Sequence, residues 1–233
     1  MNNKTYLVAT IRPWNIRAYK ETIAHYPGNW HLITKAEDLT TELVRKLKPR
    51  YVFFPHWSYI VPSEILDITE SVCFHETDLP YGRGGSPIQN LIANGHTETK
   101  VSALRMTGEL DAGPIYLKRY LSLEGLAEEI FIRSSKLVAE MILEIITTEP
   151  EPKEQEGTVR VFERRRPEQS AIPIELKTLD EIFDHVRMLD ASEYPTAFIR
   201  YGSFKLELFR PALRNDSIEA DVRITKILKE TEE

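Results

Sequence analysis

Short apolar runs alternate with amphipathic runs through the first two-thirds of the chain, and this alternation constrains the fold more than any other feature. Near-continuous apolar runs are typical of parallel strands that are buried on both faces. Between them, segments 36–48 and 86–95 are amphipathic and read as helices. The sequence therefore predicts an α/β fold, a mostly parallel sheet with helices on both faces. The predicted strands are TYLVAT (5–10), WHLIT (30–34), YVFFP (51–55) and SVCFH (71–75).

Two further strands are expected at 98–106 and 113–123, followed by a long helix at 127–147 with a single apolar stripe. Segment 147–158 then combines acidic residues with prolines and a glycine, which is typical of a connection. We therefore place a domain boundary in this segment, with one domain at 1–150.

The segment after the boundary, 158–233, is expected to form a small α+β unit. It begins with a strand-like run at 158–164 and continues with a helix at 178–189. Two strand-like runs, 196–202 and 205–213, then predict a hairpin turned by Gly202 and Ser203.

Composition restricts the classes of partner. The chain has 233 residues and a formal net charge of -6. This charge argues against a nucleic acid as the main partner, because phosphate neutralisation supplies most non-specific affinity for nucleic acids.

The single cysteine, Cys73, cannot form an internal disulfide, and no signal sequence precedes the first apolar run. We therefore expect a cytoplasmic protein. No apolar run approaches the ~20 residues that span a bilayer, so no membrane partner is expected.

The stretch SVCFHETDLPYGRGGSPIQNLIANG, residues 71–95, concentrates polar groups at the end of a predicted strand. His75 ends the strand, a glycine-dense turn follows, and Ser86 and Pro87 are suited to begin a helix that Gly95 stops. In open α/β sheets, ligands bind outside the carboxyl ends of the strands. A hydrogen-bonded structural histidine and an ordinary tight turn are the simpler interpretations of this stretch taken alone.

Asp111 adds a second functional group, in an Asp-Ala-Gly turn 36 positions after His75. A carboxylate beside a histidine can fix the tautomer of the ring and stabilise its cationic form, which is the role that a general base requires.

The pattern H-x-x-x-L-P-x-x-R-G-x-x-P, followed by D-x-G, resembles the folate-dependent N-formyltransferases, a methionyl-tRNA formyltransferase-like family. The resemblance covers roughly residues 5–150. It implies a Rossmann-like domain that binds N10-formyltetrahydrofolate and transfers the formyl group to a primary amine. By position it implies catalytic roles for His75 and Asp111. The cofactor would lie against the turn of Arg83, Gly84 and Gly85, near Pro87 and Met106.

The family's asparagine falls on Cys73, and here the sequence departs from the pattern. An asparagine donates a strong N–H bond to a developing oxyanion, whereas a thiol is a weak donor. Asn90 or a backbone N–H is a candidate replacement donor. Two alternatives for Cys73 stay open, a nucleophile that forms a thioformyl intermediate and a small apolar residue that fills a niche.

The acceptor that the resemblance implies is a small amine, and the tail resembles that of the nucleotide-sugar N-formyltransferases. This branch implies a nucleotide-activated amino sugar, of the pseudaminic or another type, in bacterial surface glycan synthesis. The family's acceptor side implies contacts from His56, Trp57, Tyr59 and Asn90, although core packing would also explain the aromatic residues. The arginines at 164–166 are candidates for phosphate binding. No metal is expected.

Several alternatives remain. The small C-terminal unit disfavours a tRNA acceptor, and a chain that starts at its first strand disfavours the deformylase relatives. A non-catalytic folate- or nucleotide-binding homologue, and a formyltransferase for another small amine, both stay open. The sequence also leaves open whether the chain forms a homodimer.

Overall fold

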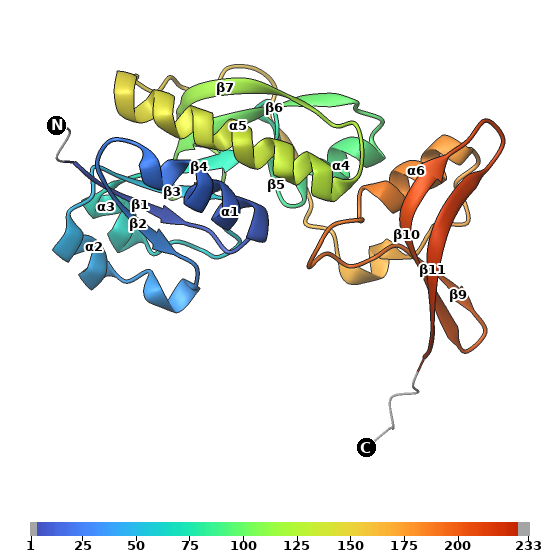
Figure 1. Cartoon of the computed structure of the whole chain (residues 1–233). Coiled ribbons are helices and arrows are strands. Elements are labelled where there is room, and N and C mark those ends of the chain that lie inside the picture. Colours follow the sequence, from blue (N-terminus) through green and yellow to red (C-terminus); the bar gives the residue numbers. More distant parts are fainter. Residues whose placement is uncertain (1–3, 228–233) are drawn as a thin grey trace.

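The computed structural model describes residues 4–227 and contains a six-stranded mixed sheet (Figure 1). The order of the strands is β2-β1-β3-β4-β6-β7. The first four are parallel, whereas β6 and β7 run antiparallel to their neighbours. The predicted α/β sheet is confirmed, with two antiparallel strands at one edge. The strands are β1 (Thr5–Ala9), β2 (Asn29–Ile33), β3 (Tyr51–Pro55), β4 (Glu70–His75), β6 (Glu98–Arg105) and β7 (Ile115–Ser122).

Helices cover both faces of this sheet, as the sequence predicted. Alternate residues of β1 and β3 enter two separate apolar clusters, one on each face. One cluster joins Tyr6, Val8 and Phe53 to the apolar stripe of the long helix α5 (Ala127–Thr148), against which α1 (Pro13–Glu21) packs. The other joins Leu7 and Val52 to α2 (Thr41–Leu47) and α3 (Ser63–Ile68).

The helix predicted at 36–48 is shorter than expected. Residues Ala36–Asp38 form a 3-10 turn, and α2 begins only after Thr40. The Thr40 side chain accepts a hydrogen bond from the N–H of Leu43 at 3.1 Å, which is the arrangement of a helix N-cap.

The glycine-dense turn contains a short strand that the sequence did not predict. This strand, β5 (Tyr81–Gly84), pairs in parallel with β8 (Arg160–Phe162). The next helix, α4 (Pro87–Ala93), begins at Pro87 as expected. The Ser86 side chain makes no cap hydrogen bond to this helix, and its Oγ instead accepts from the N–H of Arg165 at 3.1 Å.

The C-terminal part contains α6 (Leu179–Arg187) and a three-stranded antiparallel sheet in the order β11-β10-β9 (Figure 1). The predicted hairpin is confirmed, because Gly202 and Ser203 join β9 (Phe198–Tyr201) to β10 (Phe204–Leu213). The third strand, β11 (Ile218–Lys226), was not predicted.

The boundary in 147–158 stays a prediction. This segment contacts the first unit closely, since Lys153 and Ile115 exchange backbone hydrogen bonds of 2.7 and 2.9 Å. Across residues 4–227, none of the helices is both long enough and apolar enough to cross a membrane.

Candidate active site

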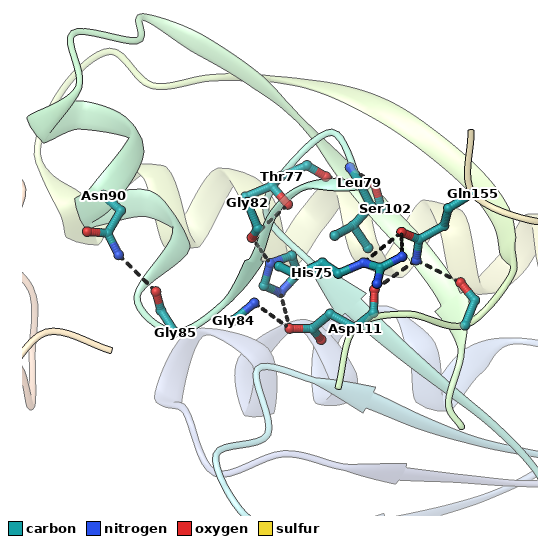
Figure 2. A network of polar contacts seen from close by, with 12 residues as sticks. His75, Thr77, Leu79, Gly82, Gly84, Gly85, Asn90, Ser102, Asp111 and Gln155 are labelled. Atoms are coloured by element: carbon teal, nitrogen blue, oxygen red, sulfur yellow. Dashed lines mark hydrogen bonds and ion pairs between the residues drawn. The ribbon is translucent and has the colours of Figure 1, made fainter. Parts of the chain in front are cut away.

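His75 ends β4 and is held by the turn that follows it. Its Nε2 lies 2.7 Å from the carbonyl oxygen of Gly82 (Figure 2). A carbonyl oxygen only accepts hydrogen bonds, so Nε2 carries the proton and donates it. In the neutral ring, Nδ1 is therefore the basic nitrogen. The side chain is almost fully buried.

Asp111 faces that basic nitrogen. One of its carboxylate oxygens, Oδ2, lies 3.7 Å from Nδ1 of His75 and accepts a hydrogen bond from the N–H of Gly84 at 2.9 Å (Figure 2). The sequence predicted that Asp111 would both orient the imidazole and stabilise its cation. In the structure Gly82 makes the hydrogen bond that holds the ring, and Asp111 faces Nδ1, where a carboxylate can stabilise a proton. The catalytic roles of His75 and Asp111 stay predictions.

The glycines of the turn are required by close packing. Gly82 has φ +78°, and a Cβ there would lie 2.7 Å from Cγ2 of Thr77. Gly84 has φ +102°, and a Cβ there would lie 2.4 Å from the carbonyl oxygen of Phe162. The turn is thus a packed element that presents the Gly82 carbonyl and the Gly84 N–H to the site.

Gln155, which the sequence reasoning missed, ties the turn to the Asp111 loop. Its Oε1 accepts hydrogen bonds from Nε and Nη2 of Arg83 at 3.1 and 2.8 Å. Its Nε2 donates to the carbonyl oxygens of Asp111 and Gly113, both at 2.8 Å. Gln155 lies in the segment interpreted as a connection, and no local pattern marked it. A cofactor role for Arg83 stays a prediction.

Asn90 lies on α4, and its amide nitrogen is directed to the carbonyl oxygen of Gly85 (Figure 2). Its Nδ2 donates to the carbonyl oxygens of Gly85 at 2.9 Å and Glu163 at 3.0 Å. Both amide protons are therefore engaged in holding the turn. This arrangement does not favour Asn90 as the oxyanion donor that replaces the family's asparagine.

Cys73 lies two residues before His75 in β4, and the alternation of a strand places both side chains on the same face. Burial raises the pKa of the Cys73 thiol, and the Asp111 carboxylate raises it further. Only the thiolate is a strong nucleophile. The electrostatics of the site therefore oppose a covalent role for Cys73.

Trp57 and Met106 border the same apolar cluster as Cys73. The indole Nε1 of Trp57 is buried and has no hydrogen-bond partner among the described residues. Tyr59 lies beside it, with the ring centroids 5.4 Å apart, but is 53% exposed. A buried donor without a partner is a candidate contact for an acceptor atom of a bound ligand.

A second imidazole–carboxylate pair lies at the neighbouring strand end. His56, after β3, has Nδ1 at 3.7 Å from Oε1 of Glu76 and Nε2 at 3.0 Å from the hydroxyl of Tyr194. The pKa of His56 is lowered to about 3, chiefly by burial and in addition by the guanidinium groups of Arg12 and Arg164. The sequence pointed to His56 but assigned no functional role to Glu76 or Tyr194.

Two surface cavities beside α1 do not include these residues. A cavity of about 510 Å³ lies between α1 and α5 and is lined by residues such as Arg17 and Lys136. Within residues 4–227, no group of three or more His, Cys, Asp or Glu side chains is arranged to hold a metal ion.

Comparison with known proteins places the chain in one family. The formyl transferase model matches residues 19–128, and the model of the methionyl-tRNA formyltransferase C-terminal domain matches residues 167–225. A methionyl-tRNA formyltransferase from Clostridium thermocellum is 46% identical, with a TM-score of 0.91 over 96% of this chain and 99% of that one.

More distant relatives include a second methionyl-tRNA formyltransferase and a sugar N-formyltransferase. A methionyl-tRNA formyltransferase from Thermotoga maritima is 28% identical over 76% of this chain, and the match spans 58% of that protein. The chain thus spans less than two-thirds of this curated relative. A sugar N-formyltransferase from a Shewanella species shares the fold, with a TM-score of 0.66 and 13% identity over 97% of this chain and 99% of that one. From these matches, and above all from the Clostridium structure, the chain belongs to the formyltransferase family, whose enzymes use formyl-tetrahydrofolate.

Proposed function

We propose that the protein transfers a formyl group from N10-formyltetrahydrofolate to a primary amine, most specifically an amine on a nucleotide-activated amino sugar. The observation that carries the proposal is the arrangement around His75. Its Nε2 proton is held by Gly82 at 2.7 Å, and its basic Nδ1 faces Asp111 at 3.7 Å. A base whose tautomer is set and whose cation is stabilised is suited to acyl transfer.

Each residue of the site has a separate role in the proposed reaction. The bound cofactor supplies the formyl carbon that the amine attacks. Nδ1 of His75 takes a proton from the attacking amine, and the Asp111 carboxylate stabilises the resulting imidazolium. Gly84 holds the carboxylate in place through its N–H. The unpartnered Nε1 of Trp57 and the side chain of Met106 are the groups that we expect to contact the pterin.

The charge of the chain supports a small acceptor. A net charge of -6 disfavours binding to a polyanion, and the Shewanella structure with the same fold is named as a sugar N-formyltransferase. Arg164 supports a phosphate-bearing acceptor. Its backbone packs against Gly85, where an added Cβ would lie 2.6 Å from the Cα of Arg164. Its side chain is exposed and makes no hydrogen bond or ion pair with other described residues.

An initiator tRNA is the second candidate acceptor, because the Clostridium and Thermotoga relatives are named methionyl-tRNA formyltransferases. Both candidates can be tested in one assay. The protein is incubated with N10-formyltetrahydrofolate and one of three kinds of acceptor: nucleotide-linked amino sugars, free amino sugars or methionyl-tRNA. Mass spectrometry detects a formylated product by a mass increase of one formyl group.

We expect formylation of at least one nucleotide-linked amino sugar and none of methionyl-tRNA. Formylated tRNA alone would overturn the proposed acceptor. Cofactor binding without any formylated product would instead support a non-catalytic homologue. The His31→Ala variant serves as a control, because His31 is an exposed histidine of β2 remote from His75 in the sheet.

A further inference from the structure

Glu76 is a buried carboxylate that has no role in the proton transfer between the amine and His75. It directly follows His75 and is 7% exposed. A side-chain hydrogen bond joins it to Ser134 of α5. Carboxylates are almost never this deeply buried without a cationic partner, because removing the charge from water is costly.

No permanent cation compensates this carboxylate. Among residues 4–227, the only basic group within ion-pair distance of Glu76 is His56, at 3.7 Å. The lowered pKa of His56 keeps that ring neutral near pH 7. Nε2 of His56 lies 3.0 Å from the hydroxyl of Tyr194, whose phenol keeps its proton because burial raises its pKa. Nδ1 of His56 has no hydrogen-bond partner among the described residues, so its 3.7 Å contact leaves Glu76 without a hydrogen bond from this ring.

Two further groups act electrostatically on Glu76. His75 directly precedes it at the end of β4, and Asp111, in the loop between β6 and β7, adds a second carboxylate. Burial raises the pKa of Glu76 to about 6, an effect that His75 opposes and Asp111 reinforces. Arg12 is paired with Glu193 at 2.8 Å, and Arg164 acts on His56 and Tyr194. Two carboxylates thus flank His75 without a lysine or arginine partner.

We propose that Glu76 binds the ammonium form of the acceptor beside His75 and removes the first of the two protons that its nitrogen must lose. This inference rests on the proposed function. The ammonium N–H bond breaks, its electron pair stays on nitrogen, and the proton forms an O–H bond on Glu76. As the amine bonds to the formyl carbon, Nδ1 of His75 takes the second proton and passes it to the departing nitrogen. Glu76 then releases its proton to water.

The direct test uses methylammonium chloride as the probe and the imidazole proton resonances of His56 and His75 as the readout. Sodium chloride keeps the ionic strength constant, and methanol serves as the neutral control. We expect saturable shifts in the wild type at about pH 7.5 that are absent with methanol. Because the carboxylate form binds the cation, the shifts should disappear as the pH falls through the pKa of Glu76, about 6.

The variant Glu76→Gln keeps the size of the side chain and its hydrogen bond to Ser134 but removes the charge. We expect its affinity for methylammonium to fall about ten- to a hundredfold, which is the range for a hydrogen bond to a charged group. Glu140→Gln, an exposed position on α5, is the matched control and should bind as the wild type does. Equal affinity in Glu76→Gln and wild type, with the variant folded by its amide spectrum, overturns the proposal.

A kinetic measurement separates this inference from the proposed function. With any acceptor that is formylated, Glu76→Gln should raise the KM for the acceptor and leave the KM for the cofactor unchanged. If no amino sugar is formylated, the proposed acceptor is wrong, while the methylammonium titration still decides the role of Glu76.

Discussion

The carbonyl oxygen of Gly82 lies 2.7 Å from Nε2 of His75 and so determines which nitrogen of the ring is basic. The same oxygen accepts a hydrogen bond from Oγ1 of Thr77 at 3.3 Å. The glycine turn therefore acts on the imidazole through its backbone. Asp111 lies on the other side of the ring, where its carboxylate can stabilise a positive charge on the imidazole.

A Gly82→Ala substitution should impair both folding and activity. The residue has φ +78°, and the added Cβ would lie 2.7 Å from Thr77 and 2.8 Å from Phe162. We expect a loss of about 1–3 kcal/mol in the free energy of unfolding and a loss of formyl transfer in the fraction that folds. Urea denaturation measures the first effect. Gly108→Ala is the control, because a Cβ there meets nothing within 4 Å.

A Cys73→Ala variant should retain most of its activity. The raised pKa keeps the thiol protonated, so we expect less than about a tenfold loss in kcat, against the hundred- to thousandfold typical of a strong oxyanion donor. Mass spectrometry of the protein during turnover should show no formyl group on Cys73. A trapped formylated thiol would establish the covalent alternative.

His56 should make the protein less stable in acid. Its pKa is lowered to about 3 in the folded state, whereas an unfolded histidine has a pKa of about 6.5. The unfolded chain therefore binds an extra proton below about pH 6.5, and stability falls as the pH decreases from there, by up to about 1.4 kcal/mol per pH unit.

The variant His56→Gln isolates this contribution. Glu76 has the opposite effect, since its raised pKa gives stability that is present below about pH 4.5 and lost as the pH rises through about 6. Urea unfolding at about pH 7.5 and about pH 5 should show a smaller loss of stability in His56→Gln than in the wild type. Identical losses in the two proteins would contradict a neutral buried His56.

Arg164 should affect binding of a phosphate-bearing acceptor. Its guanidinium is exposed and unpaired within the described residues, so Arg164→Ala should raise the KM for a nucleotide-linked acceptor about tenfold, equivalent to about 1.4 kcal/mol. The KM for the cofactor should not change. Arg45→Ala, at an exposed position on α2, provides the control. An unchanged KM for the acceptor would show that Arg164 does not contribute to acceptor binding.

The parts of the fold that were predicted from the sequence are those with a strong local pattern. Strands β1, β3 and β4 are largely buried on both faces and appear as near-continuous apolar runs. In contrast, β5 is a strand only because it pairs with β8, about 80 residues later. Likewise, β11 alternates charged with exposed apolar residues and is defined by its pairing with β10. Such pairings depend on tertiary contacts.

The same limit applies to the site. His75 and Asp111 were predicted because they belong to a recognisable motif. Gly82 contacts His75 with its backbone carbonyl oxygen, and every residue type has such an oxygen, so the sequence does not indicate this contact. Gln155 reaches Asp111 across 44 positions, and Tyr194 reaches His56 across 138. Contacts between residues so far apart in the sequence produce no recognisable spacing pattern.

The central claim is that His75 is the base and Asp111 stabilises its cation, and single-turnover formyl transfer tests it most directly. The assay compares wild type with His75→Ala and Asp111→Asn, with His31→Ala as the control, using [14C]formyl-tetrahydrofolate and an acceptor identified from the panel. We expect the rate to fall by about two to four powers of ten in both site variants and to be unchanged in His31→Ala. Wild-type rates in His75→Ala or Asp111→Asn, with the fold intact, would contradict the account.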